Sequence, residues 1–247
     1  MRNIRLIVKY DGSRYKGFQR LKDNDMTIQN KIESVLSKMT GEDIEIIGSG
    51  RTDMGVHSLG QVVNFKTNSD MSLEKMNEYL YRYLPEDMVI KDIKQVSDRF
   101  HSRYNAVSKT YLYKIYNDKY HDPFYRKYTL HIKDILDIKL MQEASDILVG
   151  KHDFTSFASS KSKKKSNIRQ INKIDIIKQD NIVNIYINAD GFLYNIVRII
   201  VGCLIDIGLG KITKEDLKNM LEAKDRTKSS DTAQAKGLYL YEVFYNN

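Results

Sequence analysis

The feature that most constrains the fold is a pattern of strands and helices that occurs twice along the 247 residues. Apolar residues that alternate predict strands, and apolar residues spaced three or four apart predict helices. The first copy predicts strands over 4–8, 44–47, 61–65 and 88–96 and helices over 28–39 and 73–84. Thr27 and Gly41 stand where the caps of the first helix belong, and Pro85 follows the second helix.

The second copy has the same order. It predicts strands over 106–116, 168–177, 182–189 and 238–245 and helices over 136–148, 192–207 and 213–221. Two β-α-β-β-α-β runs indicate two ferredoxin-like modules of the α+β class. We place the modules at 1–103 and 104–247, because the polar join near 98–104 lacks the composition of a flexible linker. We expect them to pack side by side, sharing one antiparallel sheet, with an active-site cleft between them.

A glycine-rich loop over 48–57 is the strongest functional candidate. Its glycines permit positive φ and the close approach of a ligand. Asp53 is its only carboxylate, and Arg51 supplies a planar cation suited to phosphate or a base edge. The two side chains fit a nucleophile and its electrostatic partner. A turn in which Asp53 merely caps the next segment fits the same residues.

The charge balance favours an anionic partner. Lysine and arginine number 40 against 32 acidic residues, a formal net charge of +8, and such a surface attracts nucleic acid. An ordinary basic cytosolic protein has the same balance. The 17 tyrosines suit base stacking, although most tyrosines of a sheet protein pack in its interior.

Several classes of protein are not expected. Cys203 is the only cysteine and lies in an apolar run, so it is expected to be a core residue. The longest apolar run, Ile199–Ile205, is far shorter than the roughly 20 residues of a membrane span, and no signal peptide is evident. The five histidines lack the spacing of a zinc site. We expect a cytoplasmic protein without metal and without membrane attachment.

Further candidate residues lie in the second copy. Tyr111 and Tyr113 share one face of a strand and either stack on a base or pack in the core. Arg198 lies on an apolar helix, where it either pairs with a carboxylate such as Asp53 or extends to solvent. A dense basic run predicts a loop that binds phosphates or is simply solvated: Lys161, Lys163, Lys164 and Lys165.

The chain resembles the tRNA pseudouridine synthase A family nearly from end to end. The central match is 50–57 followed by 60–63. Supporting matches occur in the same order as in the family, at 10–13 with 17–19, 109–113, 192–198 with Gly202, and 237–240. The resemblance implies two ferredoxin-like domains, a homodimer, and no cofactor or metal. It also implies conversion of uridine to pseudouridine in the anticodon stem-loop of tRNA.

The resemblance also implies roles for four residues. Asp53 is the catalytic aspartate, and Arg51 helps to displace and hold the target nucleotide. Tyr111 contacts the target base, and Arg198 pairs with the aspartate. Since a base inside a stem is unreachable, it must be flipped out at a cost of a few kcal/mol.

The chain departs from the family pattern at a few positions. Ser49 and Met54 stand where alanine is usual, Phe18 replaces a tryptophan, and Gln234 begins a segment that lacks the usual proline. A paralogue that modifies another RNA, such as ribosomal RNA, therefore remains an alternative. A non-catalytic RNA-binding module and an enzyme of another class with a bound metal or nucleotide are further alternatives.

Overall fold

The computed structural model describes residues 1–159 and 166–246, which form two compact units. The first unit comprises Met1–Val107 together with Tyr239–Asn247, and the second is Ser108–Leu238. The expected modules, 1–103 and 104–247, assign the last strand to the second module. In the structure that strand belongs almost wholly to the first unit, where Tyr239 pairs in parallel with His57.

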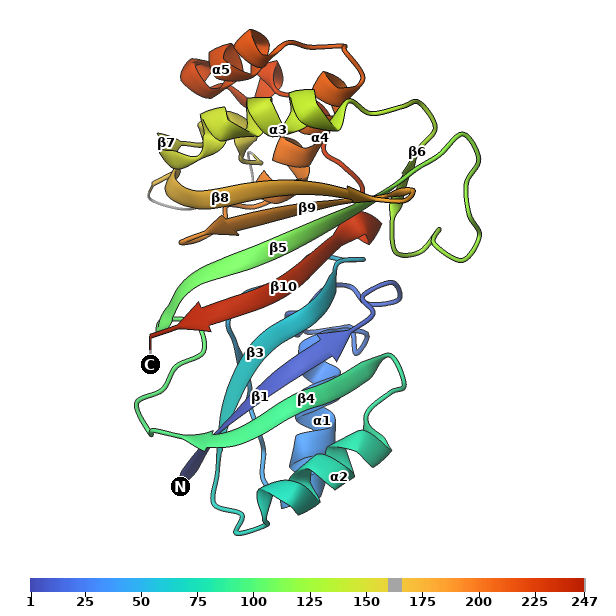
Figure 1. The fold of residues 1–247 in the computed structure, drawn as a ribbon. Coiled ribbons are helices and arrows are strands. Elements are labelled where there is room, and N and C mark those ends of the chain that lie inside the picture. Colours follow the sequence, from blue (N-terminus) through green and yellow to red (C-terminus); the bar gives the residue numbers. More distant parts are fainter. Residues whose placement is uncertain (160–165, 247) are drawn as a thin grey trace. The chain divides into compact units, whose positions relative to one another are not determined.

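The first unit follows the expected β-α-β-β-α-β order. Its elements are β1 (Arg2–Tyr10), α1 (Ile28–Thr40), β2 (Ile47–Gly48), β3 (His57–Thr67), α2 (Leu73–Tyr83) and β4 (Met88–Val96), followed much later by β10 (Leu238–Tyr245). Strand β1 lies between β4 and β3, antiparallel to both, and β2 pairs with the far side of β3. This ferredoxin-like arrangement confirms the α+β class (Figure 1).

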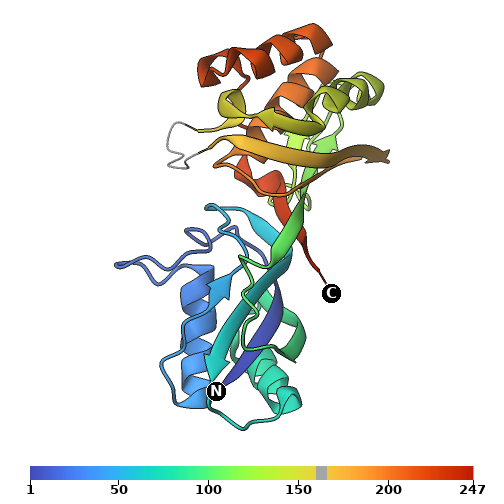
Figure 2. The same cartoon turned by 90° about the vertical axis from the view of Figure 1, so that its left-hand side faces the viewer.

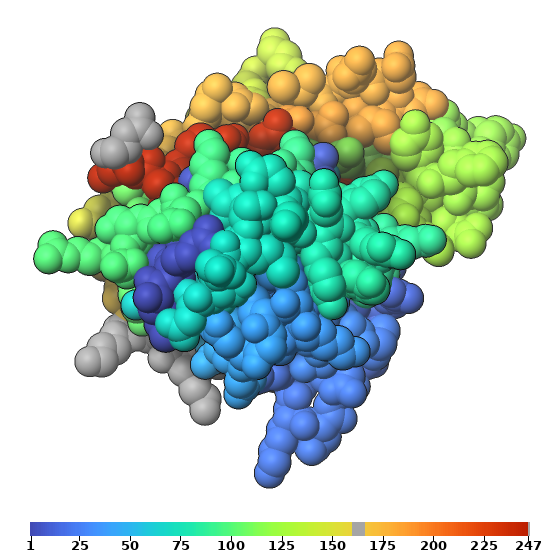
Figure 3. Space-filling model, turned by 90° about the horizontal axis from the view of Figure 1, so that it is seen from below, coloured from blue at the N-terminus to red at the C-terminus, as the bar shows by residue number. Residues whose placement is uncertain are grey.

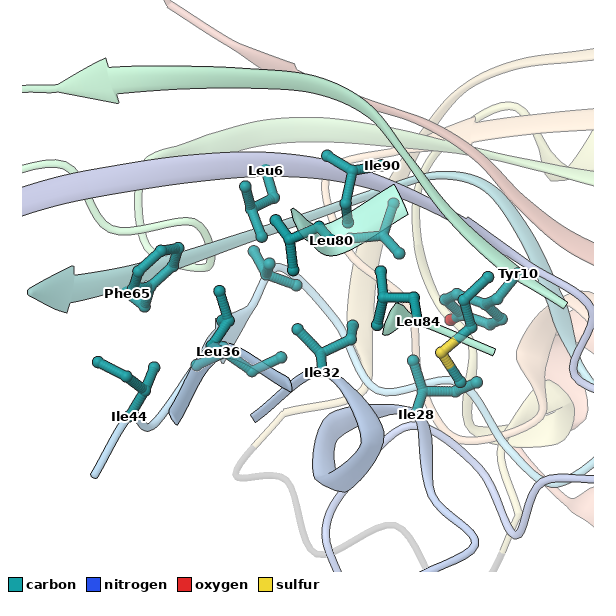
Figure 4. Packing of buried hydrophobic residues seen from close by; sticks show 14 of the residues in the cluster. Leu6, Tyr10, Ile28, Ile32, Leu36, Ile44, Phe65, Leu80, Leu84 and Ile90 are labelled. Carbon is teal, nitrogen blue, oxygen red and sulfur yellow. The ribbon is translucent and has the colours of Figure 1, made fainter. Parts of the chain in front are cut away.

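Alternation along β1 sets the core of the first unit. Ile4, Leu6 and Val8 are fully buried on one face of the sheet, and α1 and α2 cover that face. Figure 4 shows Leu6 on the same side of the sheet as Leu36 of α1 and Leu80 of α2, within one hydrophobic cluster. The caps of α1 are those expected: the Thr27 side chain accepts from the Asn30 N–H, and Gly41 adopts φ 72°.

The strand expected over 44–47 is largely absent, although its alternation is real. Ile44 and Ile46 are buried. Their backbone N–H groups donate to side chains of α1 instead of a neighbouring strand, at 3.0 Å to Ser37 Oγ and 3.0 Å to Glu33 Oε1. Side-chain acceptors thus replace a β-ladder here, and only Ile47–Gly48 pairs with β3.

The second unit is a sheet covered on one side by helices. Its elements are β5 (Ala106–Asn117), β6 (Leu130–Ile132), α3 (Ile138–Ser145), β7 (Gly150–Asp153), β8 (Ile168–Gln179), β9 (Ile182–Ala189), α4 (Ile196–Gly208) and α5 (Lys214–Ala223). The antiparallel order is β5-β9-β8-β7, and β6 pairs with β5. The three helices lie on the same side of this sheet (Figures 1 and 2).

Three expectations in the second unit differ from the structure. Leu140 is 47% exposed and Met141 is buried in its place, whereas Leu136, Ala144 and Leu148 of the predicted helical stripe are buried. Helix α4 begins at Ile196, because Asn195 before it adopts a left-handed φ of 65°. The short strands β6 and β7 were not expected, since three or four residues are too few to show a period.

Three chemical expectations can be compared with the described residues. Cys203 is fully buried, as expected of a core residue, and burial raises the pKa of its thiol. Across 1–159 and 166–246, no helix has both the length and the apolar character that a membrane crossing demands. Within the same residues, no three histidine, cysteine or acidic side chains are grouped so that they would hold a metal ion.

Candidate active site

The loop over 48–57 leads from β2 to β3 in the first unit, and its first half is fastened to β3. The Ser49 N–H donates to the Val62 carbonyl at 2.8 Å. The Ser49 hydroxyl donates to Gln61 Oε1 at 2.6 Å, and Gln61 Nε2 donates to the Gly50 carbonyl at 2.8 Å. Gln61 is fully buried, so this amide fixes the backbone on the N-terminal side of Arg51.

The middle of the loop meets the connection that leads from β1 to α1, residues 11–27. Part of this connection projects from the first unit (Figures 2 and 3). Its inner part is bound to Thr52: the Phe18 N–H donates to the Thr52 carbonyl at 3.0 Å. The Tyr10 hydroxyl, at the end of β1, lies 2.8 Å from Thr52 Oγ1. Thr52 is therefore held through both its backbone and its side chain.

Asp53 follows Thr52 and begins a tight turn. Its carbonyl accepts from the Val56 N–H at 3.2 Å, and Gly55 takes the positive φ of 76° that the turn requires. Arg51 and Met54 are exposed, and Asp53 is partly buried. The loop thus presents Arg51 and Asp53 from a backbone that hydrogen bonds hold in place.

Two glycines of the connection allow its close approach to the loop. A Cβ atom on Gly12 would lie 1.9 Å from the Val56 carbonyl oxygen. Gly17 adopts φ 105°, and a Cβ there would lie 2.9 Å from the Thr52 carbonyl oxygen. The glycines at 12 and 17 thus leave room for the protein's own backbone.

His57 is a buried residue at the end of the loop to which our sequence analysis gave no separate role. Its Nδ1 accepts from the Gly12 N–H at 3.1 Å and lies 3.1 Å from Asp11 Oδ1. One nitrogen cannot accept from Gly12 and donate to Asp11 at once, so the hydrogen bond from Gly12 belongs to neutral His57. The ring stacks on Tyr239 with centroids 4.8 Å apart. In the sequence His57 stands between Val56 and Ser58, so no apolar alternation marks it as a buried position.

Tyr111 lies in the second unit, on β5. Its side chain is buried, 9% exposed, and packs edge-on against Phe192 with centroids 4.8 Å apart and an interplanar angle of 76°. Tyr113, on the same face, is fully buried and donates to the Gln234 carbonyl at 2.7 Å. Both rings pack inside the unit, and Phe192 fixes the orientation of the Tyr111 ring.

Arg198 lies in the first turn of α4, in the second unit. Its Nε donates to the Ala233 carbonyl at 2.6 Å, and its Nη1 donates to Asn195 Oδ1 at 3.1 Å. A Cβ on Gly202 would lie 2.1 Å from the Asp231 carbonyl oxygen. The segment before β10 therefore lies directly on α4. The expected pair of Arg198 with Asp53 joins the two units and stays a prediction.

The structure brings some of the candidate residues together. Arg51 and Asp53 share the loop over 48–57 in the first unit, and Tyr111 and Arg198 belong to the second. The four lysines of the basic run, Lys161, Lys163, Lys164 and Lys165, lie outside the described residues.

Comparison with known proteins assigns the chain to a family. The profile of the family described as tRNA pseudouridine synthase matches residues 6–105 and 144–246, which include the Asp53 loop and Arg198. The chain belongs to the tRNA pseudouridine synthase family. The resemblance inferred from the motifs is thereby confirmed.

Relatives match along almost the whole chain. The protein named tRNA pseudouridine synthase A of Bacillus sp. (strain KSM-64) is 53% identical over 245 residues, covering 99% of this chain and 100% of the relative. tRNA pseudouridine synthase A 2 of Bacillus cereus (strain ZK / E33L) is 49% identical over 243 residues, covering 98% and 99%. A crystal structure of the archaeal box H/ACA sRNP Nop10-Cbf5 complex aligns with 91% of this chain and 59% of that chain at 10% identity and a TM-score of 0.35, too low to carry an argument.

We predict that Gly12→Ala destabilises the protein by about 2 kcal/mol or more, because the added methyl meets the rigid carbonyl of Val56. Gly41→Ala is the matched control: Gly41 also lies in the first unit, but nothing lies within 4 Å of its Cβ position. Its cost is limited to the left-handed φ, about 1 kcal/mol. Urea unfolding measures both free energies, and equal losses would contradict the close approach at Gly12.

Proposed function

We propose that this protein converts uridine to pseudouridine in tRNA, with Asp53 as the catalytic aspartate. The observation that carries the proposal is the turn at Asp53. It lies within the residues matched by the family profile and holds the only carboxylate of the loop over 48–57. A backbone hydrogen bond from Phe18 restrains it at Thr52, and another from Val56 to Asp53 closes it. A carboxylate on such a turn is suited to act on one bound nucleotide.

The reaction needs no reagent beyond the protein. The bond between N1 of uracil and C1′ of ribose breaks, the base turns, and C5 bonds to C1′. C5 loses its proton and N1 gains one, so atoms and electrons balance without an oxidant, reductant or water. Asp53 acts in its ionised form, as a nucleophile or as a base.

The other candidate residues have complementary roles in this proposal. Arg51 is exposed beside Asp53, where its guanidinium would fill the space of the flipped nucleotide and bind phosphate. Tyr111, oriented by Phe192, would contact the detached base and keep it from leaving. Arg198 would favour the ionised carboxylate of Asp53. The roles of Tyr111 and Arg198 rest on the family resemblance.

The anticodon stem-loop is the proposed position of the target uridine, and it also rests on the resemblance. Met54 is 59% exposed and follows Asp53, so its side chain adds bulk beside the proposed catalytic group. Two relatives from Clostridium tetani (strain Massachusetts / E88), named tRNA pseudouridine synthase A 1 and A 2, are 49% and 48% identical to this chain. Overall identity thus favours neither of them as a guide to the modified position.

We predict that Asp53→Asn yields no detectable pseudouridine while its affinity for tRNA stays within about twofold of wild type, because only the reacting group is lost. Single-turnover conversion of tRNA and a binding assay measure the two effects. Asp43→Asn, at an exposed aspartate of the same unit, is the matched control and keeps the wild-type rate.

The outcomes of this experiment separate the alternatives. A wild-type rate in Asp53→Asn would refute the catalytic assignment. Binding of RNA with no product from the wild-type protein would favour a non-catalytic RNA-binding module, and metal bound in stoichiometric amount would favour another class of enzyme. The pseudouridines missing from a strain that lacks the protein would distinguish tRNA from ribosomal RNA as the substrate.

We predict that tRNA affinity falls steeply with salt and that part of this dependence comes from the basic run. Replacing Lys161, Lys163, Lys164 and Lys165 by alanine should reduce the slope of log K against log salt by up to about 3, because each phosphate contact contributes roughly 0.7 to 0.9. The control replaces four other exposed lysines of the second unit, Lys139, Lys173, Lys214 and Lys218. Equal slopes in the two variants would argue against phosphate contacts by the run.

We also propose that two copies of the chain form a homodimer, which the resemblance implies. Sedimentation equilibrium is expected to give about twice the 28.8 kDa of one chain. A mass near that of one chain would contradict the dimer. A cytoplasmic location stays a prediction from the sequence.

A further inference from the structure

We propose that Tyr10 is a positioning residue for the proposed reaction: its hydroxyl holds Thr52, and Thr52 sets the backbone that carries Asp53. This inference rests on the proposed function, because it assigns a purpose to the geometry around the proposed catalytic aspartate. Tyr10 does not touch the substrate in this proposal, and it acts only through Thr52.

The sheet itself places the Tyr10 side chain. Tyr10 is the last residue of β1 and is paired with Ser58 of β3 on one side and Met88 of β4 on the other. Its side chain is 4% exposed and belongs to the core cluster of the first unit. The hydroxyl at the tip of this fixed ring lies 2.8 Å from Thr52 Oγ1. This hydrogen bond therefore fixes the position of Thr52 relative to β1, the strand between β3 and β4.

The state of the Tyr10 hydroxyl suits this role. Burial raises its pKa well above the usual value, although the hydrogen bond with Thr52 opposes the shift. The hydroxyl thus keeps its proton at neutral pH and remains a donor as well as an acceptor.

The bonds around Asp53 converge on a short piece of backbone. The Thr52 carbonyl accepts from Phe18, and the Asp53 carbonyl accepts from Val56. Gln61 of β3 holds the Gly50 carbonyl on the other side of Arg51. Among these contacts, the bond to Tyr10 is the one that anchors the Thr52 side chain to the sheet.

Loss of this bond is expected to affect the rate more than the fold. Tyr10→Phe keeps the buried ring and removes only the oxygen. The sheet and helices are unchanged, but Thr52 loses its link to β1 and the turn at Asp53 gains freedom. Because a misplacement of about 1 Å at a reacting group costs up to about 100-fold in rate, a modest loosening is measurable.

The experiment measures single-turnover pseudouridine formation with enzyme in excess over tRNA. Tyr10→Phe and Thr52→Val should each lower the saturating rate about tenfold or more, while the half-saturating enzyme concentration stays within about twofold. Thr52→Ser keeps the hydroxyl and should restore the rate to within about threefold of wild type. The double variant Tyr10→Phe/Thr52→Val should be no slower than its slower parent, because both changes break the same bond.

Tyr15→Phe is the matched control for loss of a buried tyrosine hydroxyl. Tyr15 is a buried residue of the connection from β1 to α1, and its hydroxyl donates to Asp87 at 2.6 Å and not to Thr52. It should keep the wild-type saturating rate. The inference is overturned by a wild-type rate in Tyr10→Phe, by an equal loss in Tyr15→Phe, or by a Thr52→Ser variant as slow as Thr52→Val.

The same assay distinguishes failure of this inference from failure of the proposed function. An inactive Asp53→Asn variant beside a fully active Tyr10→Phe variant rejects the positioning role alone. A fully active Asp53→Asn variant rejects the proposed function and this inference with it.

Discussion

The first unit depends on an approach of two backbone segments that side chains would prevent. The connection after β1 lies against the loop over 48–57, and Gly12 and Gly17 leave the space for the carbonyls of Val56 and Thr52. Without that approach the Phe18 N–H would not reach Thr52. The hydrogen bond that restrains the backbone beside Asp53 therefore depends on Gly12 and Gly17, two residues that have no side chain to make contacts.

The second unit uses the same combination of a missing side chain and a polar anchor. Gly202 lets the chain at Asp231 lie on α4, and Gly237 fits against Tyr113 and the Lys114 carbonyl. Between these points, Arg198 binds the Ala233 carbonyl and Tyr113 binds that of Gln234. Arg198 thus has a documented structural task, the seating of the segment before β10, in addition to any part in chemistry.

The sequence alone predicted elements whose signal is periodic and local. The strand over 88–96 and the caps of α1 were found because alternation, Thr27 and Gly41 act within a few residues. The start of α4 and the shortening of the strand expected over 44–47 were not predicted, because they depend on a left-handed Asn195 and on side-chain acceptors from α1. The Asp53 loop was recognisable from its glycines. The hydrogen bond between Tyr10 and Thr52 was not, because it joins residues 42 positions apart and leaves no local pattern in the sequence.

The bond from residue 18 to Thr52 has a consequence for sequence drift. It is made by a main-chain N–H, which phenylalanine and the tryptophan usual at this position in the family supply alike. The carbonyl of residue 234, which accepts from Tyr113, is likewise a main-chain group that is present whatever the side chain at this position. Divergence at position 18 can therefore accumulate while the hydrogen bond that restrains the backbone beside Asp53 is kept, and divergence at position 234 while the contact with Tyr113 is kept.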